Sequence, residues 1–247
     1  MDWKDKIGGA SRCHMVGAMV LGASLVVSCA SRGLLSSEKP DRSTWTPYTI
    51  ELSDWTLKFD VPGGQVVEPW GGRLWIRTVD LDRHKKLLEG NAVRVFEAYW
   101  EYEGGVLDGL LGSIQLDIFV VSRFEGYYQN LLSTDDLESY SRIRNSQVWD
   151  PANEQHRRRG EHRLLVNIPQ IYDRVTLHEH QWLRFKFGGH LDLYGYVIGL
   201  RDDRYVEVQF SFADNGKKRP DWRIDAERLR EEIAATLRLE QKPKSPL

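Results

Sequence analysis

Cysteine is scarce in this chain, and its scarcity excludes several classes of protein. The sequence has two cysteines in 247 residues, Cys13 and Cys29, both close to the N-terminus. The remainder of the chain therefore has neither a disulfide framework nor a cysteine nucleophile. Beyond Cys29 it also lacks any apolar run long enough to cross a bilayer, which takes about 20 residues.

An excess of charge of either sign is missing as well. The formal net charge is −2, which suggests no nucleic-acid partner. The sequence contains no G-x-S-x-G nucleophile elbow, no glycine loop for phosphate and no carboxylate pair placed to cleave a glycoside. We therefore expect no cofactor and find no recognisable catalytic set.

Residues 1–28 have the organisation of a secretory signal peptide. A short polar start contains Lys4, Lys6 and Arg12, and it precedes the apolar segment MVGAMVLGASLVV at 15–27. That segment is too short to cross a membrane as a helix. A charged start, a short apolar middle and a small-residue end together predict a cleaved signal.

The residues VVSC, Val26 to Cys29, resemble a bacterial lipobox. The resemblance implies that Cys29 begins the mature protein and carries diacylglycerol on its sulfur and an acyl group such as palmitate on its amine. Two such anchors hold a protein stably on a membrane. Ala30 rather than aspartate follows the cysteine, a pattern that resembles lipoproteins sorted to the outer membrane, so we expect the protein on the periplasmic face of that membrane. A Cys13–Cys29 disulfide is the alternative.

The remaining sequence divides into a tether, one domain and a tail. Residues 29–47 are rich in serine, proline and charge, and we interpret them as the lipidated cysteine followed by a flexible tether. Residues 48–240 have the size of a single domain. Residues 241–247 contain two prolines and are expected to be a disordered tail.

Alternating apolar residues predict an antiparallel sheet. The clearest strand is 204–212, where Val206, Val208, Phe210 and Phe212 point inward and Tyr205, Glu207, Gln209 and Ser211 point to solvent. One buried and one solvated face are typical of antiparallel sheets. Similar patterns predict further strands at 55–61, 93–103 and 113–121, and one after Gly71–Gly72.

Two helices complete the predicted α+β fold, in which both pack on a mostly antiparallel sheet. One spans 133–144 and begins with Ser133 and Asp136 in the spacing of a capping box. The other, at 221–240, is a C-terminal amphipathic helix whose apolar stripe includes Leu229 and Ile233.

Two resemblances accompany this pattern. The entry WTLKFDVPGG, the later strand pair YGYVIGLRDDRYVEVQFSF and the final helix resemble the Mog1/PsbP-like α/β/α sandwich across 45–239. This resemblance implies a protein that binds other proteins and carries no shared active site. The combination of lipobox, tether and α+β domain also resembles periplasmic immunity lipoproteins, which neutralise toxins delivered by neighbouring bacteria.

The motif LHEHQW offers a candidate metal site. If it lies on a strand, His178 and His180 point the same way and could share a zinc ion. His162 or His190 could supply a third ligand. The alternative function is therefore a periplasmic zinc-dependent hydrolase using His178 and His180, with Glu161 or Asp192 as base. A solvated strand face explains the same pattern.

Three segments are candidates for contact with a protein partner. Trp149 lies in the loop-like stretch NSQVWDPANE, and Tyr127–Tyr128 follow RFEG, where exposed aromatics often mark contact surfaces. Arg157, Arg158 and Arg159 form a basic loop that could contact anionic lipid, meet an acidic partner or simply be solvated.

We therefore predict a non-enzymatic lipoprotein, anchored to the membrane through Cys29, that binds a periplasmic or envelope protein. Immunity against a secreted toxin and a role as an envelope accessory factor are both open. A structural link to peptidoglycan is a third possibility.

Overall fold

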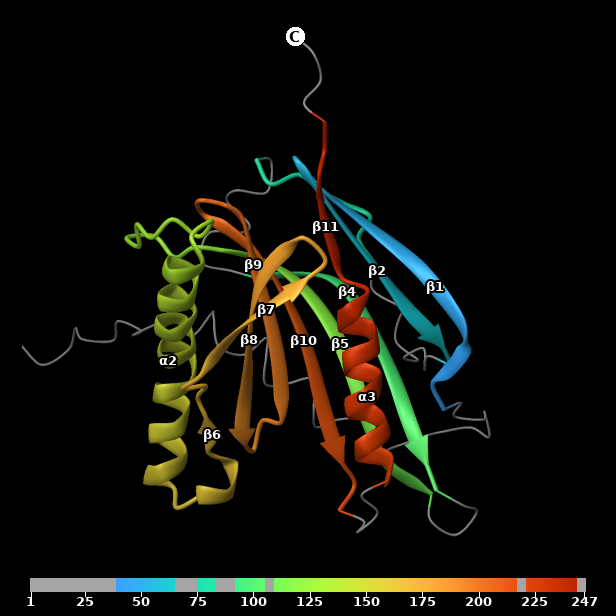
Figure 1. Cartoon of the computed structure of the whole chain (residues 1–247). Helices are drawn as coiled ribbons and strands as arrows, with labels where there is room; N and C mark the ends of the chain where they lie inside the picture. The colour runs from blue at the N-terminus through green and yellow to red at the C-terminus, as the bar shows by residue number, and fades with distance from the viewer. Residues whose placement is uncertain (1–38, 65–74, 83–91, 105–108, 217–220, 244–247) are drawn as a thin grey trace, which may run out of the picture. The chain divides into compact units, whose positions relative to one another are not determined.

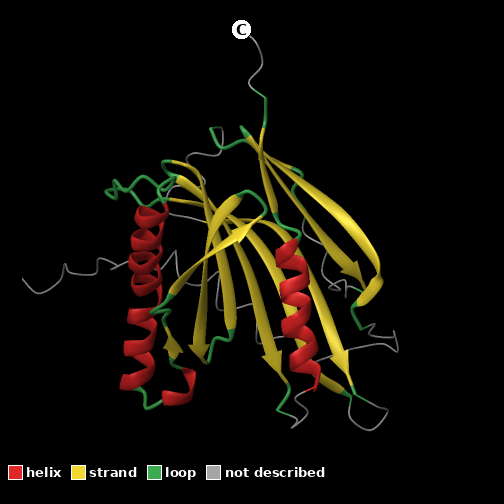
Figure 2. Ribbon diagram, in the orientation of Figure 1, coloured by secondary structure: helices red, strands yellow, loops and turns green. Residues whose placement is uncertain are grey.

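Strands dominate the described part of the structure, a computed structural model, in which two α-helices and one short 3₁₀ helix, η1 (His162–Leu164), accompany them (Figure 2). The described residues belong to one unit of the chain, Ser36–Leu247. The predicted signal peptide and Cys29 lie outside them. The structure describes residues 39–64, 75–82, 92–104, 109–216 and 221–243.

The strands form two sheets. The smaller has the order β11-β2-β1-β3, and the larger has the order β4-β5-β10-β9-β8, with both β6 and β7 paired to β8. Every strand pair is antiparallel except β1–β3. The predicted α+β class with mostly antiparallel sheets is confirmed. The strands are β1 (Asp41–Leu52), β2 (Trp55–Gly63), β3 (Thr78–Val79), β4 (Ala92–Glu103), β5 (Leu110–Ser122), β6 (Val166–Asn167), β7 (Tyr172–Leu177), β8 (His180–Gly189), β9 (Leu193–Arg201), β10 (Arg204–Asp214) and β11 (Arg238–Gln241).

The main hydrophobic core lies on one face of the larger sheet. Val206, Val208 and Phe210 of β10 are fully buried there, as the alternation in the sequence predicts. The smaller sheet packs against the same core, where the rings of Phe59 and Phe96 meet at 4.8 Å. Burying a side chain of this size contributes about 1.5–3 kcal/mol, so this face supplies much of the stability.

Helix α2 (Thr134–Arg158) covers the opposite face. The ring of Tyr140 on α2 lies 6.0 Å from that of Tyr205, and Arg144 pairs with Glu207. Tyr205, Glu207 and Gln209 are therefore buried, and the prediction that they face solvent is wrong. The cause is that α2 packs on this face with a buried side that is largely polar and includes Ser141, Arg144 and Asn145. The helix also has 25 residues instead of ending at Arg144.

The two ends of α2 follow the expected chemistry of helix termini. The Ser133 hydroxyl accepts a hydrogen bond from the Asp136 amide at 3.4 Å, as the capping spacing predicts. The last turn contains His156, Arg157 and Arg158, whose positive charge complements the negative end of the helix dipole.

The C-terminal helix ends at an earlier residue than the sequence predicts. Helix α3 (Asp221–Ala235) ends before residue 240, because β11 follows and pairs with β2. Similarly, β1 begins at Asp41, inside the predicted tether. Among the described helices, none has the length and apolar character needed to cross a membrane.

Candidate functional site

The loop between β5 and α2, residues 123–133, is attached firmly to the turn between β9 and β10. The amides of Arg123 and Leu131 donate to the carbonyls of Asp203 and Asp202, at 2.9 and 3.0 Å. The Arg123 guanidinium also donates to the carbonyls of Gln129 and Asp202. These contacts give a connecting loop a defined conformation.

The two tyrosines of this loop have different environments. Tyr127 packs its ring 5.8 Å from that of Tyr140, and its hydroxyl accepts a hydrogen bond from Gln147 of α2. Tyr128 is 88% exposed, and Leu132 in the same loop is 56% exposed. Of the predicted pair, Tyr128 is thus the exposed residue, and Leu132 is exposed in the same fixed loop.

Gly199 of β9 allows the loop to lie directly on the sheet. A Cβ atom at this position would meet the Leu131 carbonyl oxygen at 2.0 Å and the Leu132 Cα at 3.1 Å. Leu131 itself is fully buried. The exposed residues of the loop therefore stand on a packed base, which holds them in place.

The other predicted contact residues lie elsewhere. Trp149 is in α2, half-buried, with its ring 6.2 Å from that of Phe187, so its assignment to a loop is wrong. Arg157 and Arg158 form the last turn of α2, and Arg159 is its C-cap.

The α2 arginines are distant from the tyrosine loop. Gln147 contacts that loop, and about 16 Å of helix separates Gln147 from Arg158 at about 1.5 Å per residue. Figure 1 shows the C-terminal end of α2 opposite the end that carries the β5–α2 loop. The structure therefore does not join the predicted contact residues into one surface.

The two candidate metal ligands do not share a strand. His178 lies in the turn between β7 and β8 with φ of 53°, and its Nε2 is 3.0 Å from the Ala235 carbonyl oxygen. His180 begins β8, and its ring lies 5.9 Å from that of Trp55. Among the described residues, no group of three or more histidine, cysteine, aspartate or glutamate side chains could hold a metal ion.

A polar layer lies between α2 and the sheet. Arg144 donates to Glu207 at 2.8 Å, and the two side chains are 10% and 2% exposed. Gln209 donates to the other Glu207 oxygen at 2.8 Å. Burial raises the pKa of Tyr205, whose hydroxyl has no hydrogen-bond partner in the described structure. This layer fixes α2 on the sheet.

A second polar cluster surrounds Asp117 of β5. Gln115 donates to Asp117 at 2.9 Å, and Arg94 lies 2.8 Å from Glu97 and 3.2 Å from Asp117. Burial raises the pKa of Asp117 to about 6, and the Glu97 carboxylate adds to this effect against the opposing charge of Arg94. Asp117 is therefore a buried acid that titrates near neutral pH.

The raised pKa of Asp117 predicts a specific pH dependence of stability. Between about pH 4 and pH 6 the folded chain keeps a proton that the unfolded chain loses, so the free energy of unfolding falls as pH rises. We expect Asp117→Asn to gain roughly 3 kcal/mol relative to the natural chain between pH 4 and pH 7. Urea unfolding at several pH values measures this difference. The exposed Glu125→Gln is the control, and parallel profiles for all three chains would contradict the prediction.

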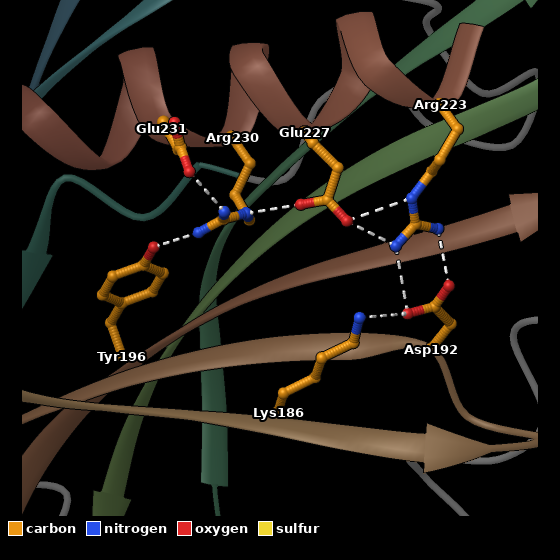
Figure 3. A network of polar contacts seen from close by, with 7 residues as sticks. All are labelled: Lys186, Asp192, Tyr196, Arg223, Glu227, Arg230 and Glu231. Atoms are coloured by element: carbon orange, nitrogen blue, oxygen red, sulfur yellow. Dashed lines mark hydrogen bonds and ion pairs between the residues drawn. The ribbon is translucent and has the colours of Figure 1, made fainter. Parts of the chain in front are cut away.

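A third network joins α3 to the β8–β9 region (Figure 3). Arg223 donates to both oxygens of Asp192, at 2.5 and 3.1 Å, and to Glu227 at 2.7 Å. Arg230, which is 4% exposed, bonds to Glu227 and to the Tyr196 hydroxyl. These charges are paired within the protein, so we interpret the network as a structural link. It also occupies Asp192, one candidate base of the zinc alternative.

Comparisons with known proteins leave the function to be inferred from the chain itself. The sequence matches no protein-family model, and no curated protein or solved structure is significantly similar to it.

The best candidate site is the β5–α2 loop with Tyr128 and Leu132. Sequence reasoning missed Leu132, because Leu131 and Leu132 are adjacent and equally apolar. Only the fold shows that the first is buried and the second exposed.

Proposed function

We propose that this chain is a membrane-anchored lipoprotein that binds another protein in the periplasm. The observation that carries the proposal is the exposed pair Tyr128 and Leu132 on a loop held by backbone hydrogen bonds. Rigid aromatic side chains lose little conformational entropy on binding, and tyrosine is frequent among the residues that dominate interface energies. A secreted toxin and an envelope assembly protein are the two classes of partner.

The anchor in this proposal is Cys29, supported by the lipobox-like VVSC and the short apolar segment before it. Lipidation would hold the domain on the periplasmic face of the outer membrane and confine its search for a partner to that surface. We further propose that the domain has the Mog1/PsbP-like arrangement. Helices α2 and α3 contact opposite faces of the larger sheet, through Glu207 and Tyr196 respectively, which supports this finer class.

One experiment tests both parts of the function. The full chain, with a C-terminal affinity tag, is expressed in its own cells, mildly crosslinked, recovered from separated membranes and read by mass spectrometry. We expect outer-membrane location, a lipid mass on Cys29 and one stoichiometric protein partner. Cys29→Ala is the control, which should lose the lipid and leave the membrane fraction. A wild-type chain without lipid contradicts the anchor, and a lipidated chain without a partner contradicts the binding role.

A further inference from the structure

Carboxylates lie within the β5–α2 loop and in the turn beside it. Glu125 is exposed in the same loop, and the turn between β9 and β10 contributes Asp202 and Asp203. The Asp202 carbonyl accepts from the Leu131 amide at 3.0 Å, so this turn lies directly beside the loop. We call Tyr128, Leu132, Glu125, Asp202 and Asp203 together the Tyr128 surface.

Further acidic residues extend this end of the domain. Asp54 and Asp82 both pair with Arg201, at 3.0 and 2.6 Å, so one guanidinium serves two carboxylates. The first turn of α2 adds Asp135 and Asp136. Figure 1 shows the β9–β10 turn and the β5–α2 loop at the same end of the larger sheet.

Among the described residues at this end, most cations bind carboxylates or carbonyls, and they are fewer than the acids. The Arg123 guanidinium binds two backbone carbonyls, and Arg204 pairs with Asp203. Arg174 of β7 pairs with Asp135. In the described part of the chain, the carboxylates of Glu125 and Asp202 make no ion pair. The Tyr128 surface is therefore apolar at its exposed side chains and negative around them.

The opposite end of α2 has the reverse charge. Four arginines lie there with two glutamates: Arg157, Arg158, Arg159 and Arg163 with Glu154 and Glu161. The domain is therefore positive at this end and negative at the other, although the whole chain is nearly neutral. The excess of negative charge around Tyr128 is thus local. A negatively charged membrane or an acidic protein would be repelled from that end, whereas a cationic protein surface would be attracted.

We propose that the partner is a protein with a lysine- and arginine-rich surface, which docks on the Tyr128 surface. This inference rests on the proposed binding function and names its site and the charge of its partner. Tyr128 and Leu132 enter an apolar part of that surface and set the dissociation rate. The nearby carboxylates, of which Glu125 and Asp202 make no ion pair with a described residue, accelerate association through long-range attraction.

Site-specific photocrosslinking locates the surface. Benzoylphenylalanine replaces Tyr128 in the full lipidated chain, and Ile224 and Arg158 serve as matched positions because they are also exposed, at 61% and 77%. Irradiation of intact cells should give one heavier product from position 128 and none from the other two. The crosslinked partner peptide should contain an excess of lysine and arginine.

Binding kinetics of the partner so identified then test the charge. Raising the salt concentration from about 50 mM to about 500 mM should slow association about tenfold. Tyr128→Ala should weaken binding at least about tenfold through faster dissociation. The double variant Glu125→Gln with Asp202→Asn should slow association and leave the dissociation rate unchanged. The control, Glu154→Gln with Glu161→Gln, makes the same charge change at the opposite end and should leave both rates unchanged. Among the described residues, the Asp202 side chain makes no hydrogen bond or ion pair, so the variant with Glu125→Gln and Asp202→Asn is expected to fold normally.

The outcomes separate this inference from the function it rests on. Crosslinks from position 224 or 158 but not from 128 would contradict the Tyr128 surface as the docking site, while the proposed binding function would remain supported. A product formed with a second copy of this chain, a partner peptide without basic residues, or association that ignores salt would overturn the basic partner. No crosslink from any position, together with failed capture, would overturn both proposals.

Discussion

Replacing Arg144 by methionine is expected to lower the free energy of unfolding by about 3–5 kcal/mol. Arg144 donates to Glu207 at 2.8 Å beneath α2, and the Glu207 side chain is only 2% exposed. Without its guanidinium partner, Glu207 keeps a single hydrogen bond from Gln209, at 2.8 Å. An unpaired charge in a buried position is strongly destabilising, because water cannot reach it.

A second substitution tests whether the loss comes from the unpaired charge of Glu207. Arg144→Met combined with Glu207→Leu removes both charges and keeps most of the buried volume. We expect this double variant to recover most of the lost stability, since apolar replacement of a buried ion pair is often neutral or favourable. Urea unfolding, monitored by tryptophan fluorescence, measures the free energy of unfolding of four chains: the natural chain, Arg144→Met, Glu207→Leu and the double variant.

The exposed pair Arg158–Glu154 provides the control for Arg144. Its N–O distance is 2.9 Å, similar to the buried pair, but its side chains are 77% and 50% exposed. Arg158→Met should therefore change the free energy of unfolding by less than about 1 kcal/mol. The two single variants, Arg144→Met and Glu207→Leu, each lose some free energy of unfolding. If the double variant loses the sum of these two amounts, the proposed coupling between Arg144 and Glu207 is contradicted.

The same polar layer explains what the sequence could and could not predict. The inward face of β10 was predictable, because Val206, Val208 and Phe210 alternate with polar residues. Its other face was assigned to solvent, because Glu207 and Gln209 are polar. In the structure that face is buried by a helix whose own buried side is polar. Apolar periodicity cannot report a contact between two polar surfaces.

Helix α2 was shortened in the prediction for the same reason. Beyond the predicted end at Arg144, the buried residues of α2 are Asn145 and Asn153, and the segment contains Pro151, a composition that indicates a loop. Asn153 instead makes two hydrogen bonds of 2.8 Å with the backbone of Val166, in place of apolar packing. Trp149, Arg157 and Arg158 were misassigned to loops as a consequence. Their place in the fold depends on these long-range polar contacts.

The β5–α2 loop was a better case, because its residues are close in the sequence. Tyr127 and Tyr128 follow a glycine in a polar stretch, and that pattern correctly indicated an aromatic loop. The packing of Tyr127 on Tyr140 and the support under Leu131 depend on residues far along the chain. Which aromatic is presented was therefore decided by tertiary structure.

Gly199→Ala is expected to displace this loop and to cost several kcal/mol if the loop stays in place. The new Cβ would lie 2.0 Å from the Leu131 carbonyl oxygen, which belongs to the backbone and cannot rotate away. Overpacking of this kind typically costs about 1–3 kcal/mol even where side chains can adjust. Relief requires the loop to move, which breaks the 3.0 Å hydrogen bond from the Leu131 amide to Asp202.

Hydrogen exchange at the Leu131 amide measures this displacement directly. We expect exchange at least about tenfold faster in Gly199→Ala, since losing about 1.4 kcal/mol of local stability changes the open population tenfold. Gly188→Ala is the matched control on neighbouring β8, where a Cβ would meet its nearest atom at 3.5 Å, an ordinary contact. Because Tyr128 stands on the same loop, Gly199→Ala should also reduce the crosslink from position 128 while Gly188→Ala preserves it. Unchanged exchange at Leu131 would mean that the sheet, and not the loop, absorbs the added methyl group, and the loop would then lack the fixed base that the binding proposal requires.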